Sequence, residues 1–103
     1  MSAAAAGLTG FERRHLRALA HPLKPVVQVG QAGVTDALMA AVEEALLTHE
    51  LIKVRLLKPD AKRDLARQLA ERSGAELVGL VGHTAILYRP HPDTPRIVLP
   101  RRD

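Results

Sequence analysis

The chain has 103 residues, of which 47% are hydrophobic and 25% charged, so its composition predicts one globular domain and excludes a disordered chain. Cysteine is absent, which excludes disulfide bonds, thiol catalysis and cysteine-based zinc sites. The formal net charge of +4 favours anionic partners, but one Phe, one Tyr and no Trp leave few rings on which nucleic-acid bases could stack.

The sequence contains neither the pattern of a transmembrane helix nor that of a secretion signal. No apolar run approaches the roughly 18 residues of a transmembrane helix, and Met1 to Gly7 lacks the basic start and long apolar core of a secretion signal. We therefore expect a cytoplasmic protein without membrane contact. Residues 1–7, which are mostly small, are predicted to be a disordered tail, and residues 101–103 a basic C-terminal tail.

The first predicted helix begins at Thr9 and ends at Pro22. Thr9 and Glu12 have the spacing of a capping box, which satisfies free amides at a helix start. Helical spacing divides the following residues into two faces. The predicted inward face holds Phe11, His15, Ala18 and Leu19, and the basic face holds Arg13, Arg14, Arg17 and His21.

A strand, a glycine loop and a second helix come next. Val26 to Val29 is a β-branched run that predicts a buried strand, and the strand breaks at the loop Gly30-Gln31-Ala32-Gly33. Thr35 can cap a helix that continues to about Thr48. Leu51 to Leu57 then alternates as a second strand, with Lys53 and Arg55 on the face opposite its apolar residues.

The remainder predicts one more helix and a hairpin. Asp60 is the expected cap of the third helix, and Gly74 is its expected stop. Leu77 to Val81 and Ala85 to Tyr88 read as two antiparallel strands joined by a tight turn, and Arg96 to Asp103 as an edge segment or tail. The predicted class is therefore α/β, with the order α-β-α-β-α-β-β and a four-stranded mixed sheet.

The Gly30 to Gly33 loop is the leading candidate for a binding site. It joins a strand to a helix N-terminus, where free amides and the positive end of the helix dipole favour a phosphate. The alternative is an ordinary tight turn, because a G-x-x-G string alone is weakly specific. Four of the eleven acids lie between Val34 and Glu50, a stretch with no Lys or Arg, so the remaining chain is strongly basic. This distribution predicts one basic side, although solvated helix faces would look similar.

Catalytic and metal sites are not expected. None of the five histidines forms an HxxxH-type pair or lies beside a suitable carboxylate motif, and the adjacent Glu43 and Glu44 point in different directions on a helix. Serine nucleophiles are limited to Ser2 and Ser73, one in the tail and one at a helix end. We therefore expect a non-enzyme without cofactor, metal or small-molecule substrate.

Several blocks of sequence, in order, resemble a known family. They are Leu19 to Val27, Gly30 to Gly33, His49 to Val54 and Gly82 to Pro90. From Leu8 to about Pro100 the chain resembles the CRM (chloroplast RNA splicing and ribosome maturation) domain in its single-domain bacterial YhbY-like form. The resemblance implies a fold similar to the C-terminal domain of translation initiation factor three, with a loop like the GxxG loop of KH domains, and an RNA-binding domain over residues 8–100.

The resemblance also implies a role in assembly of the large ribosomal subunit, through ribosomal RNA in pre-ribosomal particles, and we expect a monomer. Family members often carry Lys inside the loop, whereas Gln31 and Ala32 are neutral, so basic residues elsewhere should supply most of the attraction. The expected RNA-binding residues are Gly30, Gln31, Ala32, Gly33, Thr35, Arg13, Arg14, Arg17, His21, Lys24, Lys53, Arg55 and Arg89. The alternative hypothesis is an adaptor that docks on basic ribosomal proteins through the acidic second helix, with Glu43, Glu44 and Glu50.

Overall fold

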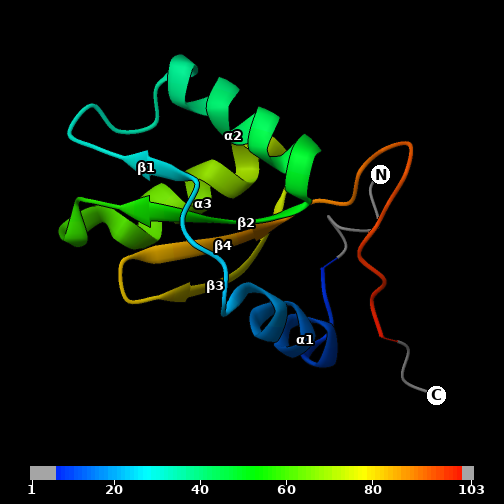
Figure 1. Cartoon of the computed structure of the whole chain (residues 1–103). Coiled ribbons are helices and arrows are strands. Elements are labelled where there is room, and N and C mark those ends of the chain that lie inside the picture. The colour runs from blue at the N-terminus through cyan, green and yellow to red at the C-terminus, as the bar shows by residue number, and fades with distance from the viewer. Residues whose placement is uncertain (1–6, 101–103) are drawn as a thin grey trace.

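The computed structural model describes residues 7–100 (Figure 1). Residues 1–6 and 101–103 lie outside this range, and with them most of the predicted N-terminal tail and all of the predicted C-terminal one. The elements are α1 (Gly10–Ala20), β1 (Val27–Val29), α2 (Asp36–His49), β2 (Leu51–Leu56), the 3-10 turn η1 (Pro59–Ala61), α3 (Lys62–Ser73), β3 (Glu76–Val81) and β4 (Thr84–Tyr88). Within residues 7–100, no helix combines the length and apolarity needed to cross a bilayer.

The helix ends follow local side-chain chemistry in most cases. Thr9 accepts a hydrogen bond from the Glu12 amide at 3.0 Å and donates its own amide to the Glu12 carboxylate at 2.9 Å, so the predicted capping box is confirmed. Gly74 ends α3 in the left-handed conformation, as predicted. The predicted cap at Asp60 is wrong, because Asp60 lies inside η1 and this extra turn moves the start of α3 to Lys62.

The four-stranded sheet is mixed, as predicted, and the structure gives its strand order as β1-β2-β4-β3. β1 and β2 are parallel, because the helical crossover α2 returns the chain to the end of the sheet where β1 started. The β3–β4 hairpin and the β2–β4 pair are antiparallel. Val29 pairs with Leu56, and Gln28 with Arg55. The glycine loop after β1 and the last residue of β2 therefore lie at the same end of the sheet.

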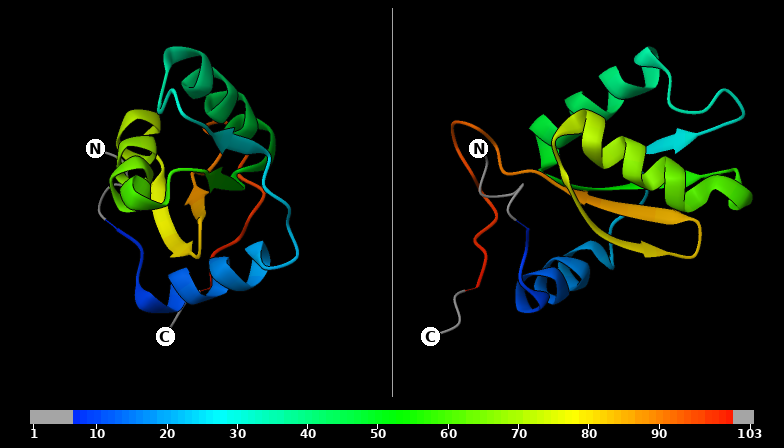
Figure 2. Two further views of the ribbon diagram at one scale, coloured as in Figure 1. Left: turned by 90° about the vertical axis from the view of Figure 1, so that its left-hand side faces the viewer. Right: turned by 180° about the vertical axis from the view of Figure 1, so that it is seen from behind.

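Helices cover the two sheet faces unequally. α2 and α3 lie together on one face, and α1 alone lies on the other (Figure 2). The main core fills the space under α2 and α3 with aliphatic side chains, among them Val42, Leu46, Leu56 and Leu69. α1 packs against β3, β2 and β4, whereas β1 lies at the edge of the sheet, so the α1 side of β1 and of the adjoining part of β2 keeps polar residues.

The inward face of α1 differs from the sequence prediction. Leu16 and Ala20 are fully buried, whereas Leu19 is 41% exposed and Ala18 is also exposed. The Arg13 guanidinium also lies toward the sheet and donates to the carbonyls of Leu77 and Val78 in β3. Positions 13, 16 and 20 share one helical face, which burial of Leu16 and Ala20 together with this contact makes the inner one.

The segment after β4 is held by one carboxylate and adds no strand. Glu50 is completely buried and accepts hydrogen bonds from the amides of His91 at 2.7 Å, Arg96 at 3.0 and 3.1 Å, and Ile97 at 2.9 Å. Ile97 and Leu99 pack against the second core cluster, around Leu16. Residues 96–100 form no strand and are bound to the domain through these contacts.

Candidate nucleic-acid interface

The Gly30 to Gly33 loop projects from the end of β1 (Figure 1). The Gly33 amide donates to the Gly30 carbonyl at 3.1 Å, which closes a tight turn and leaves Gln31 and Ala32 exposed at its tip. Gly33 has a φ of +75°, a conformation that L-residues with a side chain rarely adopt. Gly30 has no such backbone requirement, and a Cβ built on it meets nothing within 4 Å. The fold therefore requires glycine at position 33 but not at position 30.

The far end of the loop is held by α2 and α3. The Thr35 hydroxyl accepts from the Leu38 amide at 3.1 Å, so Thr35 acts as the predicted helix cap. Arg72 of α3 donates to the Val34 carbonyl at 2.8 Å and to the Asp36 carboxylate at 2.9 Å. The Asp36 carboxylate already lies at the helix N-terminus, so a phosphate there would have an anion beside it, which Arg72 partly offsets.

Arg72 is a positioning residue that the sequence analysis missed. It lies 38 residues from Val34 in the chain, and no local pattern signals so distant a contact.

Three of the predicted RNA-binding cations are engaged inside the protein. Arg13 donates to the Val78 carbonyl at 3.3 Å and to that of Leu77. Lys53 donates to two carbonyls of the segment between α1 and β1, those of His21 and Leu23, both at 3.1 Å. These two side chains therefore position α1 and the segment that follows it.

Arg89 forms the third internal contact. Its guanidinium binds both Glu43 carboxylate oxygens, at 2.8 and 2.6 Å, and the Ser73 carbonyl at 2.7 Å. The hydrogen bond from Arg89 outweighs the effect of burial and holds the pKa of Glu43 below its usual value. The acidic surface assumed by the adaptor hypothesis is reduced accordingly, because Glu50 is buried and Glu43 is paired, which leaves Glu44.

A second group of predicted cations remains available. This group consists of Arg14, Arg17, His21, Lys24 and Arg55, all of which are exposed. Within residues 7–100, their side chains make no hydrogen bond or ion pair. Lys24 and Arg55 line an open depression of about 640 Å³ together with Gln28. Arg17, His21 and Lys53 line a neighbouring one of about 260 Å³. Neither depression has an acidic lining residue.

These depressions define the basic sheet face, formed by Arg17, His21, Lys24, Lys53 and Arg55. It covers the part of the sheet beside α1 and extends along β1 toward the glycine loop. Arg14 is separate, because it lines a small pocket with Phe11, His15 and Pro100. Gln28, the one polar residue of β1, was not among the predicted RNA-binding residues, although the β1–β2 register places it beside Arg55.

No metal-binding cluster accompanies these cations in the part of the chain that the structure describes. Across residues 7–100, His, Asp and Glu side chains do not gather in groups of three or more that could hold a metal ion. The chemistry this surface offers is attraction and hydrogen bonding to anions.

Comparison with known proteins identifies relatives over almost the whole chain. Residues 8–89 match the model of the CRS1 / YhbY (CRM) domain. The chain is 41% identical over 95 residues to the "Probable RNA-binding protein YqeI" of Bacillus subtilis, covering 90% of this chain and 99% of that protein. It is 38% identical over 97 residues to an "RNA-binding protein" of Haemophilus influenzae, covering 92% and 97%. The solution structure of the hypothetical protein SAV1595 from Staphylococcus aureus is similar, with a TM-score of 0.80, 36% identity, and coverage of 91% of this chain and 100% of the other.

Proposed function

Since the chain belongs to the CRS1 / YhbY (CRM) domain family, we propose that it is an RNA-binding protein acting in assembly of the large ribosomal subunit. Residues 8–100 form the RNA-binding domain in this proposal, and the partner is ribosomal RNA in pre-ribosomal particles. The protein acts as a cytoplasmic monomer without a catalytic step. The observation that carries the proposal is the basic sheet face, whose two depressions have no acidic lining residue and whose exposed cations lead to the projecting glycine loop.

The binding mode follows from which groups are free. Lys24 and Arg55 lie beside β1 and contact successive phosphates, while the exposed backbone of Gln31 and Ala32 approaches the sugar-phosphate chain. Gly30 allows that approach because it places no Cβ in the way. Lys53 contributes indirectly, since it holds the segment that carries Lys24. Because these contacts address phosphates, affinity depends on salt more than on base sequence.

Affinity for a transcript of large-subunit ribosomal RNA, measured across a salt series, tests the proposal. We expect a negative slope of log affinity against log salt. Arg55→Gln should weaken binding about three- to tenfold and make that slope shallower by about 0.7 to 0.9, the share of one phosphate contact. Arg63→Gln is the matched control, because Arg63 is also exposed but lies on α3, across the sheet.

Two results would count against the proposal. A slope near zero for the wild-type protein removes the electrostatic mechanism. Equal losses in Arg55→Gln and Arg63→Gln show that net charge, rather than the basic sheet face, governs binding. Sedimentation of cell extracts adds the biological test: the protein should comigrate with large-subunit precursors and leave them after ribonuclease digestion, whereas retention would favour the adaptor hypothesis.

A further inference from the structure

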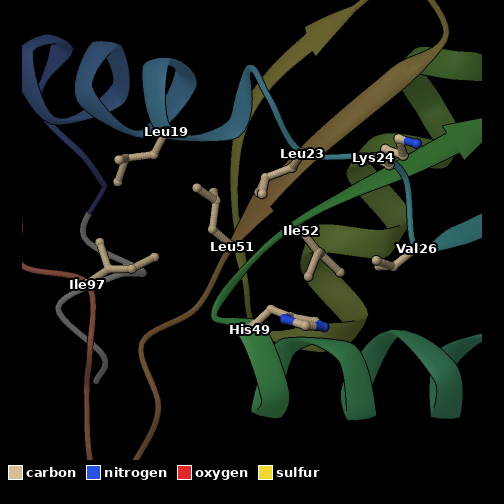
Figure 3. Close-up of a pocket in the computed structure, with 8 residues that line it drawn as sticks. All are labelled: Leu19, Leu23, Lys24, Val26, His49, Leu51, Ile52 and Ile97. Carbon is tan, nitrogen blue, oxygen red and sulfur yellow. The ribbon is translucent and has the colours of Figure 1, made fainter.

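An apolar groove adjoins the basic sheet face at the start of β1. Its volume is about 470 Å³, and its lining residues come from α1, the following segment, α2, β2 and the C-terminal segment: Leu19, Leu23, Lys24, Val26, His49, Leu51, Ile52 and Ile97 (Figure 3). Leu51 and Ile52 are buried, whereas Leu19 and Leu23 are each 41% exposed and Val26 is 50% exposed. The protein thus leaves an aliphatic surface open where its own core ends.

The walls of this groove are held in place by hydrogen bonds to the backbone. Lys53 donates to the Leu23 carbonyl at 3.1 Å and so fixes the segment that carries one wall. On the other side, the Ile97 amide donates to the buried Glu50 carboxylate at 2.9 Å. Pro22 and Pro25 further restrict the backbone around Leu23. A groove built in advance costs a ligand little ordering free energy.

Charge and continuity indicate what kind of ligand fits. Lys24 and Val26 line both this groove and the depression that contains Gln28 and Arg55, so the two form one path. The groove is lined by Lys24 and His49 but by no acidic residue. A suitable ligand therefore places an apolar body in the groove and an anion at Lys24. A nucleotide within an RNA strand has this combination, because its base and phosphate are adjacent.

We propose that this groove binds an unstacked nucleobase of the same RNA strand whose phosphates contact Lys24 and Arg55. The proposal rests on the proposed RNA-binding function and adds a base-binding subsite to it. Tyr88 is buried and Phe11 lines another pocket, so the base contacts aliphatic side chains and the His49 imidazole instead of a Phe or Tyr ring. Such a subsite favours single-stranded RNA over a continuous duplex, in which bases stay stacked.

Two labelled RNA strands of equal length and charge test the subsite. One is an oligouridine, and the other keeps every ribose and phosphate but has hydrogen in place of each base. Fluorescence anisotropy should show the wild-type protein binding the base-containing strand about tenfold more tightly. Leu19→Gln and His49→Gln, made separately, should bring this ratio close to one while leaving affinity for the baseless strand unchanged. Leu47→Gln, which changes an exposed leucine of α2 outside the groove, should keep the ratio.

The possible failures are distinguishable. If both groove variants keep the wild-type ratio, the subsite is overturned while salt-dependent RNA binding stands. If the wild-type protein binds neither strand nor the ribosomal RNA transcript, the proposed function fails and the subsite with it. If the groove variants bind both strands like wild type but dissociate from large-subunit particles, a protein segment occupies the groove, and the nucleobase proposal is wrong.

Discussion

Replacing Glu50 with Gln tests the contact that holds the C-terminal segment. The carboxylate is fully buried and accepts hydrogen bonds from three backbone amides, those of His91, Arg96 and Ile97. Gln has nearly the same shape and keeps one acceptor oxygen, but it places an NH₂ group where the second oxygen was. At least one buried amide then faces another donor.

The expected cost follows from these contacts. A hydrogen bond to a charged group contributes about 1.5–3 kcal/mol, a neutral one about 0.5–1.5 kcal/mol, and an unsatisfied buried donor costs about 1–3 kcal/mol. Glu50→Gln should therefore lower the free energy of unfolding by about 2–4 kcal/mol at neutral pH. Glu50 has a φ of 64°, and because Gln carries a Cβ just as Glu does, we expect the strain at this position to cancel in the comparison.

Acid should reduce the difference between the two proteins. Burial raises the pKa of Glu50, but hydrogen bonds from the His91, Ile97 and Arg96 amides outweigh it and hold the pKa below its usual 4.5. A lowered pKa in the folded state contributes stability that is present above the unfolded value and is lost as pH falls through the folded value. Wild type should lose this contribution below about pH 4.5, whereas Glu50→Gln has none to lose.

Urea unfolding followed by circular dichroism, repeated from neutral to acidic pH, measures both effects. Hydrogen exchange should also show faster exchange of the Arg96 and Ile97 amides in the variant. A stability difference below about 0.5 kcal/mol at neutral pH, or one that does not shrink in acid, would refute the assigned role of the carboxylate.

Two further predictions concern the glycine loop and the Arg89–Glu43 pair. Gly33→Ala should lower the free energy of unfolding by about 1–2 kcal/mol, because position 33 has a positive φ. Gly30→Ala should leave the midpoint of urea unfolding unchanged but weaken RNA binding. If folded Gly30→Ala binds RNA normally, the loop is only a turn. Arg89→Gln should raise the pKa of Glu43 toward its usual value, which an NMR titration measures. Wild type loses the stability that this carboxylate contributes when acid protonates it, and the variant should lack that contribution. An unchanged pKa of Glu43 in the variant would mean that the pair does not form in solution.

The elements whose signals are local could be predicted from the sequence. The Thr9–Glu12 cap, the Thr35 cap and the Gly74 stop each depend on residues within about one helical turn, and all three occur in the structure. Asp60 was misassigned because a cap-like residue also suits the 3-10 turn in which it lies. Alternation likewise placed Lys53 and Arg55 on the polar face of β2, since side chains on a strand point alternately to opposite sides.

The use made of each cation was decided only by the tertiary structure. Sequence alone identified the basic residues and their segregation from the acidic helix, because charge and order along the chain are properties of the sequence. It could not separate Lys53, whose ammonium group binds a carbonyl 30 residues away, from Arg55, which stays exposed. The same limit applies to Arg13, 64 residues from its partner in β3, and to the apolar groove, whose walls come from five segments. Periodicity shows which side chains share a face, but folding determines what that face meets.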